Sequence, residues 1–119
     1  MQLQRLAVLL CALAILGVVI ASCGGDSEAP ARPSEVPAGV PFVDQDDLRF
    51  TPGELKVKAG DRVYFANSET ALHTVTIDGK NDSGTMKKGD VYVWAAPAAG
   101  TFKVTCDFHP QMRATITVE

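Results

Sequence analysis

The sequence contains few of the residues that proteins use for chemistry, with only two histidines and three cysteines among its 119 residues. It also lacks an excess of positive charge, since 11 Lys and Arg stand against 14 Asp and Glu, a formal net charge of −3 at pH 7. A nucleic-acid-binding protein needs a basic patch, so this composition argues against that class. After the first 22 residues no stretch shows a sustained helical hydrophobic period, and long helices are not expected.

A segment long enough to span a membrane as a helix is missing as well. The positive residue Arg5 precedes an apolar run from Leu6 to Ile20, and these 15 residues are fewer than the roughly 20 that a spanning helix needs. A positive start followed by such a run predicts a secretory signal over residues 1–22. The end of the run, Ile20-Ala21-Ser22-Cys23, resembles the lipobox of bacterial lipoproteins. That resemblance implies cleavage before Cys23 and a diacylglycerol on its thiol; an ordinary secretory signal is the alternative.

The lipoprotein hypothesis leaves one cysteine for the folded protein. Cys11 is removed with the signal and Cys23 is lipidated, so Cys106 remains alone. A single thiol cannot form a disulfide within its own domain, and an exported free thiol is open to oxidation, from which a bound metal would protect it. Loss of Arg5 leaves ten Lys and Arg against 14 Asp and Glu, a formal charge of −4.

A linker and a domain are expected after the signal. Residues 24–41 are rich in Pro, Ala, Gly, Ser and Glu, with Val36 and Val40 as the only larger aliphatic residues. This segment is too poor in apolar residues to form a core, so residues 23–41 are predicted to be a lipidated cysteine and a linker. Residues 42–119 form the predicted domain.

Alternating apolar and polar residues between turn signals predict an all-β sandwich or barrel of about seven strands in the domain. Its core is thin at this size, and a bound metal would add to its stability. The apolar positions of the runs are Leu55, Val57, Val63, Phe65, His73, Val75, Ile77, Val91, Val93, Phe102, Val104, Cys106, Met112, Ala114, Ile116 and Val118.

Four potential metal ligands lie at the ends of the predicted strands. His73 begins one strand, Cys106 ends another, Met112 begins the last, and His109 lies in the loop between them. Side chains at strand ends converge on one end of a sandwich. Each residue alone is explained by packing or by an exposed loop, but two imidazoles, a thiolate and a thioether together are the ligands of a blue-copper site. Met86 is an alternative soft ligand.

The segment from Cys106 to Met112, CDFHPQM, resembles the copper loop of the cupredoxin, or type 1 blue-copper, family in its amicyanin-like spacing. The resemblance covers residues 42–119. It implies an eight-stranded Greek-key β-sandwich and one copper with equatorial ligands His73, Cys106 and His109 and a long axial bond from Met112.

The sequence departs from the family pattern in two places. The family often has Asn where Thr74 stands, and that Asn ties the two ligand segments together, so the rigidity of the site is an open question. Cys106 follows His73 by only 33 positions, so one strand is expected to be short or absent.

These features predict an electron carrier and not an enzyme. One copper would cycle between Cu(I) and Cu(II), with electrons passing through His109. We expect an exported monomer on the outer face of the cell membrane or in the periplasm, tethered by its lipid and working with redox partner proteins. The alternatives are a module that stores copper or delivers it to an oxidase, and a metal-free adhesion or structural domain. A Cys106–His109 nucleophile pair would lack an orienting third group, and no catalytic residue is predicted.

Overall fold

The computed structural model describes residues 32–119, so the predicted signal and Cys23 lie outside the described residues. The described part contains nine strands and no helix long and apolar enough to cross a membrane. The strands are β1 (Phe42–Asp46), β2 (Arg49–Thr51), β3 (Glu54–Val57), β4 (Arg62–Asn67), β5 (Thr76–Ile77), β6 (Lys80–Asn81), β7 (Val91–Ala95), β8 (Gly100–Thr105) and β9 (Arg113–Val118).

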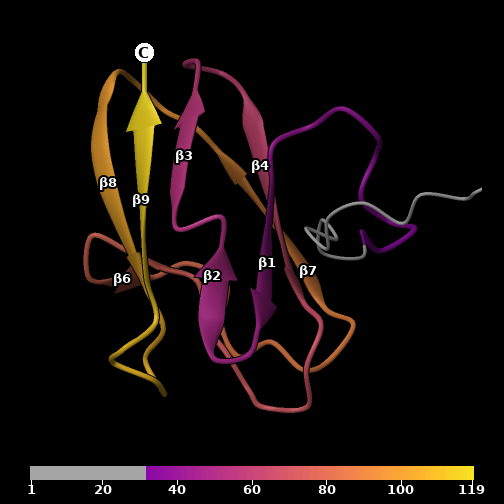
Figure 1. The fold of residues 1–119 in the computed structure, drawn as a ribbon. Coiled ribbons are helices and arrows are strands. Elements are labelled where there is room, and N and C mark those ends of the chain that lie inside the picture. The colour runs from indigo at the N-terminus through magenta and orange to yellow at the C-terminus, as the bar shows by residue number, and fades with distance from the viewer. Residues whose placement is uncertain (1–31) are drawn as a thin grey trace, which may run out of the picture.

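The strands form two sheets, one in the order β2-β1-β4-β7 and the other in the order β3-β9-β8-β5-β6. The chain crosses between the sheets several times, so β1 pairs in parallel with β4, and β3 with β9, while the other pairs are antiparallel. Figure 1 shows the C-terminus at one end of the sandwich and the β1–β2 turn and β8–β9 loop at the other. The all-β sandwich is confirmed, with nine strands because the short β5 and β6 are separate.

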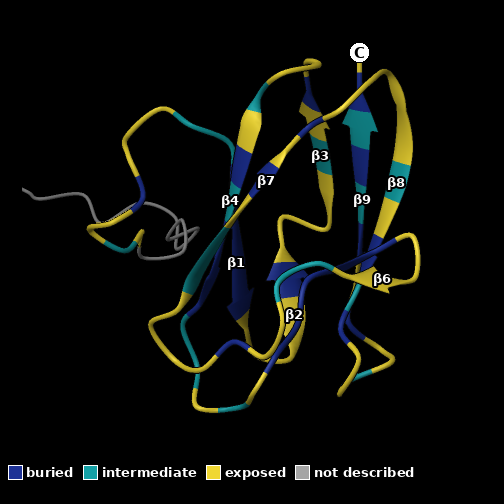
Figure 2. Cartoon of the chain, turned by 180° about the vertical axis from the view of Figure 1, so that it is seen from behind, coloured by how far each residue is buried: buried dark blue, intermediate teal, exposed yellow. Residues whose placement is uncertain are grey.

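The core lies between the two sheets, where alternate strand residues are buried (Figure 2). Aromatic side chains fill its width: the Phe50 and Phe65 ring centroids are 6.4 Å apart, and those of Trp94 and Phe102 are 5.1 Å apart, both edge to face. Such aromatic pairs add to the free energy gained from burying their area. The alternation predicted for β4 and β9 is confirmed, since Val63, Phe65, Ala114, Ile116 and Val118 are all buried.

The prediction of a strand that begins at His73, with His73, Val75 and Ile77 as its core positions, was only partly right. Only Thr76 and Ile77 are in a strand, and all five residues from His73 to Ile77 are buried. His73 forms instead an isolated bridge with Met86. The hydroxyls of Thr74 and Thr76 have hydrogen-bond partners inside the protein, which removes the usual cost of burying them.

The end of the predicted linker packs on the domain, contrary to the sequence prediction. Val36 is only 4% exposed and lies in a small cluster with Phe42 and Ala66. The Arg32 guanidinium lies 5.0 Å above the Phe42 ring and donates hydrogen bonds to the carbonyls of Pro37 and Val40. The packed domain therefore begins before Phe42. The buried Val36 and the contact of Arg32 with the Phe42 ring hold this short polar segment against the domain.

We expect Val36→Ala to lower the free energy of unfolding by about 1–2 kcal/mol, since it removes two buried carbon atoms worth roughly 0.8 kcal/mol each. Val93→Ala is the matched control, because Val93 is 40% exposed in β7. Urea unfolding of the metal-free protein measures both. Equal losses in the two variants would mean that residues 32–40 do not pack in solution.

Candidate metal centre

Three side chains meet at the end of the sandwich that carries the β8–β9 loop. The Cys106 Sγ lies 3.7 Å from His73 Nδ1 and 3.6 Å from His109 Nδ1, and all three donor atoms lie within 4.8 Å of one another. Ligand atoms bonded at about 2.0–2.3 Å to one ion are separated by roughly 3.5–4 Å when spread around it. The spacing of these three atoms therefore fits a single metal ion.

Two consecutive turns in the β8–β9 loop bring its ligand candidates together. The His109 N–H donates to the Cys106 carbonyl at 3.3 Å, and the Met112 N–H donates to the His109 carbonyl at 2.9 Å. These two turns join Cys106 to His109 and His109 to Met112. Met112 is 1% exposed and lies in the core cluster with Cys106, directly before β9.

His73 is held from the opposite side by backbone pairing. Its N–H donates to the Met86 carbonyl at 3.1 Å, and the Met86 N–H donates back at 2.7 Å. The Asn67 side chain bridges the Ala71 and Met86 carbonyls at 2.8 and 3.0 Å. Met86, the alternative soft ligand, therefore has a backbone role here, and its side chain is buried in the main core.

Glu69 determines which nitrogen of His73 faces the cluster. Its Oε1 lies 2.6 Å from His73 Nε2 and also accepts a hydrogen bond from the Leu48 N–H at 3.0 Å. A carboxylate at Nε2 keeps the proton there, so the lone pair of a neutral ring is on Nδ1, toward Cys106. Burial alone would raise the pKa of Glu69, but the hydrogen bonds from Leu48 and His73 and the nearby histidines lower it below its usual value.

The tie between the two ligand segments is present although Thr74 replaces the expected Asn. The Thr74 N–H donates to Cys106 Sγ at 3.4 Å, and the Asp107 N–H donates to Thr74 Oγ1 at 2.9 Å. No role was predicted for Glu69 or Asp107 from the sequence. The available signals were their positions, since Glu69 precedes His73 by four residues and Asp107 follows Cys106 directly.

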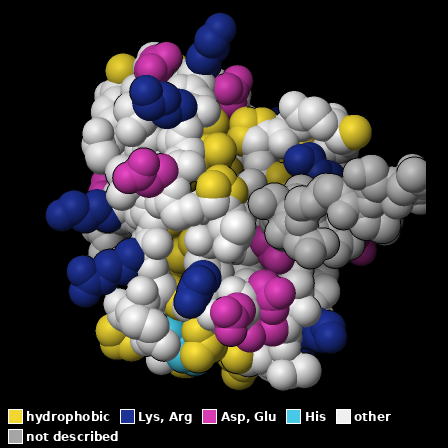
Figure 3. All heavy atoms as spheres, viewed as in Figure 1, with side chains coloured by type: hydrophobic (Ala, Val, Ile, Leu, Met, Phe, Trp, Pro, Cys, Tyr) yellow, Lys and Arg dark blue, Asp and Glu magenta, His cyan; other side chains and the backbone are white. Residues whose placement is uncertain are grey.

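The cluster approaches the surface at His109. His73 is fully buried, whereas His109 is only partly buried. Figure 3 shows a histidine side chain among hydrophobic side chains at the lower end of this face. Leu72 and Phe108, which precede the two histidines in the chain, are 44% and 50% exposed. An imidazole edge framed by apolar side chains gives a partner a dry contact close to the metal position.

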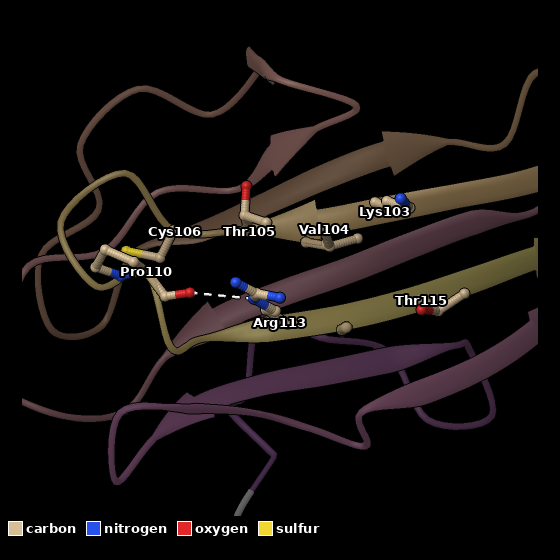
Figure 4. Close-up of a pocket in the computed structure, with 8 residues that line it drawn as sticks. Lys103, Val104, Thr105, Cys106, Pro110, Arg113 and Thr115 are labelled. Carbon is tan, nitrogen blue, oxygen red and sulfur yellow. Dashed lines mark hydrogen bonds between the residues drawn. The ribbon is translucent and has the colours of Figure 1, made fainter.

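A groove of about 500 Å³ runs along β8 and β9, and Cys106 is among the residues that line it (Figure 4). Lys103 and Arg113 line it together with Thr105, Thr115 and Pro110, whose carbonyl accepts a hydrogen bond from Arg113 Nε at 3.3 Å. Cys106 itself is 3% exposed. The thiol therefore sits beneath a positively charged groove while it stays shielded from solvent.

Comparisons with known proteins agree with this geometry. The model of the cupredoxin-like domain family matches residues 12–118. The chain is 33% identical to amicyanin of Paracoccus denitrificans over 99 residues, which cover 78% of this chain and 76% of that protein. It is 31% identical to amicyanin-alpha of Methylorubrum extorquens over 114 residues, with 91% and 93% covered.

Solved structures of amicyanin share the fold. The crystal structure of the Paracoccus versutus protein has a TM-score of 0.66 and 30% identity, covering 71% of this chain and 86% of that chain. A Cu(I) structure of a methionine-to-glutamine mutant of amicyanin has a TM-score of 0.65 and 33% identity, with 71% and 87% covered. Family, fold and donor atoms thus point in one direction. The chain belongs to the cupredoxin-like family, as a blue-copper electron-transfer protein that has one copper as its cofactor and is not an enzyme.

Proposed function

We propose that His73, Cys106 and His109 would hold the copper and that Met112 would be a weaker fourth ligand. The observation that carries this proposal is the convergence of the three donor atoms within 4.8 Å. Copper bound there supplies one-electron chemistry between Cu(I) and Cu(II). The set has both soft and harder donors, which suits both oxidation states.

The protein holds its ligands in place before the metal arrives. Glu69 keeps a proton on His73 Nε2, and the Thr74 N–H faces the Cys106 sulfur. Backbone pairing with Met86 fixes the position of His73. Ligands whose positions are set by packing and hydrogen bonds move little when the charge of the site changes, which favours rapid electron exchange.

Electrons enter and leave at the exposed edge of His109. This histidine is the only one of the three clustered donors that is not buried. The exposed side chains of Leu72 and Phe108 exclude water from the contact with a redox partner.

The mature protein is exported and anchored by a lipid on Cys23, facing membrane redox partners. The segment from Arg32 packs on the domain, which leaves eight residues, 24–31, after the lipidated cysteine. Even fully extended, these reach at most about 26–29 Å. The tether therefore keeps the copper site near the bilayer and raises its effective concentration toward membrane partners.

Copper storage or delivery to an oxidase is the competing function. A site that passes copper to another protein favours accessible, mobile ligands that bind Cu(I) alone. Here two of the three donors are buried, and His73 and Cys106 are both held by hydrogen bonds. Adding Cu(II) to the purified domain separates the two, because a carrier forms an intense blue complex that cycles reversibly. A colourless complex that binds only Cu(I) would favour delivery.

Cys106→Ser should abolish the blue absorption, since that band arises from charge transfer between sulfur and copper. Met112→Leu should keep the colour and raise the reduction potential, because a weak donor to Cu(II) is lost. Absorption spectra and voltammetry measure both. A blue Cys106→Ser protein would show that the thiolate assignment is mistaken.

Glu69→Ala should weaken metal binding by about 10–100-fold, the usual effect of removing a carboxylate that orients a ligating histidine. Glu69→Gln keeps an acceptor oxygen and should lose much less. Competition with a chromophoric chelator measures the affinities. If Glu69→Ala binds copper as tightly as the unmodified protein, Glu69 does not orient His73.

Cys23→Ala should move the protein from the membrane to the soluble fraction without changing the copper spectrum, and electron delivery in intact cells should slow. Cys11→Ala is the matched control and should remain at the membrane, since Cys11 lies in the predicted signal. Fractionation and immunoblotting follow both. Membrane retention of a processed Cys23→Ala protein would refute lipid anchoring.

A further inference from the structure

Two buried threonine hydroxyls lie behind the metal cluster. Thr74 and Thr76 are 1% and 3% exposed, and a buried hydroxyl needs hydrogen-bond partners to avoid a large desolvation cost. Thr74 Oγ1 lies 2.9 Å from Thr76 Oγ1, and both contact Asp107. None of these three residues is a proposed copper ligand.

The donors and acceptors allow only one direction for these bonds. Thr76 Oγ1 lies 2.7 Å from Asp107 Oδ1. An ionised carboxylate can only accept a hydrogen bond, so the Thr76 hydroxyl donates its one hydrogen to Asp107. Thr74 must then donate its hydroxyl proton to Thr76. The Asp107 N–H donates to Thr74 Oγ1 at 2.9 Å, which closes the circuit. The result is a ring of three hydrogen bonds that begins and ends at Asp107.

This ring joins the two segments that carry the metal ligands. Thr74 follows His73 in the chain and Asp107 follows Cys106. The other carboxylate oxygen of Asp107 accepts from Asn81 Nδ2 at 3.0 Å, and Asn81 Oδ1 accepts from the Gly84 N–H at 2.8 Å. The ring is thereby anchored to the β5–β6 hairpin and the turn after it. Hydrogen bonds in a closed circuit polarise one another and hold their members more firmly than isolated bonds.

We propose that Thr74, Thr76 and Asp107 are positioning residues that hold the Thr74 N–H against the Cys106 sulfur and so set the reduction potential of the site. This inference rests on the proposed copper ligation. A hydrogen bond to the sulfur withdraws electron density from the thiolate, which then stabilises Cu(II) less and raises the potential. Opening the ring loosens the 3.4 Å contact between the Thr74 nitrogen and the sulfur.

The charge of Asp107 acts in the opposite direction to the ring. A carboxylate on the residue next to Cys106 favours the more positive oxidation state, so it lowers the potential. Loss of the ring and loss of the charge therefore shift the reduction potential in opposite directions. Breaking the ring lowers the potential, and neutralising Asp107 while its acceptor oxygen remains raises it.

The first test compares Thr76→Val with Thr76→Ser. Valine has the shape of threonine but no hydroxyl, and serine restores the hydroxyl. In the metal-free protein, Thr76→Val should speed hydrogen exchange of the Asp107 amide by about fivefold, the factor for one net hydrogen bond. In the copper-loaded protein it should lower the potential and shift the ratio of the charge-transfer bands, while Thr76→Ser resembles the unmodified protein.

The second test uses Asp107→Asn. Asp107 is exposed, so this substitution does not change the packing of the core. Its potential should rise. The double variant Asp107→Asn with Asn81→Asp keeps a hydrogen-bond donor and an acceptor between the two side chains, but moves the negative charge outward. Its reduction potential should therefore lie between those of the unmodified protein and of Asp107→Asn.

Several outcomes would overturn the inference. Unchanged exchange in Thr76→Val means that the ring does not form in solution. Faster exchange with an unchanged potential means that the ring stabilises the loop without acting on the sulfur, and equal shifts in Thr76→Val and Thr76→Ser mean that side-chain size is responsible. A protein that binds no copper would refute the proposed function instead, and amide exchange would still decide whether the ring exists.

Discussion

A fully buried imidazole imposes the main constraint on this end of the molecule. His73 is 0% exposed, so neither ring nitrogen can rely on water. Glu69 satisfies Nε2, and Nδ1 is left to face the sulfur of Cys106. Because Glu69 also accepts from the Leu48 N–H, the β1–β2 turn is tied to the same histidine. Glu69 therefore links the β1–β2 turn to His73, whose other nitrogen faces Cys106.

The two histidines have different surroundings, and the difference suits an electron carrier. His73 is enclosed by backbone pairing and a carboxylate, whereas His109 is only partly buried and follows the exposed Phe108 in the chain. In the proposed site, the enclosed side would keep the ligands fixed and the open side would bring a partner close to the metal. A site exposed on both sides would hydrate and rearrange with each change of charge.

Polar residues of β1 form hydrogen bonds to the chain on both sides of His73, at Ser68 and at Thr74. Gln45 donates from Nε2 to the Thr74 carbonyl at 3.2 Å, and the Ser68 hydroxyl donates to the Asp44 carboxylate. Burial raises the pKa of Asp44, and the Ser68 hydrogen bond opposes that rise. Buried polar groups of β1 thus hold the loop that contains His73 in place, in a small domain whose apolar core is thin.

The sequence by itself determined the fold class and the residues of the cluster. Periodicity of two showed which side chains in β4 and β9 face the core, and the spacing of Cys106, His109 and Met112 matches two successive turns. It could not show that Thr74 and Thr76 are buried, because their partner Asp107 lies more than 30 positions away. The same holds for Val36, whose burial depends on Phe42 and Ala66 meeting beneath it. Local pattern reveals faces and turns, whereas partners brought together by long-range packing exist only once the two sheets have closed on each other.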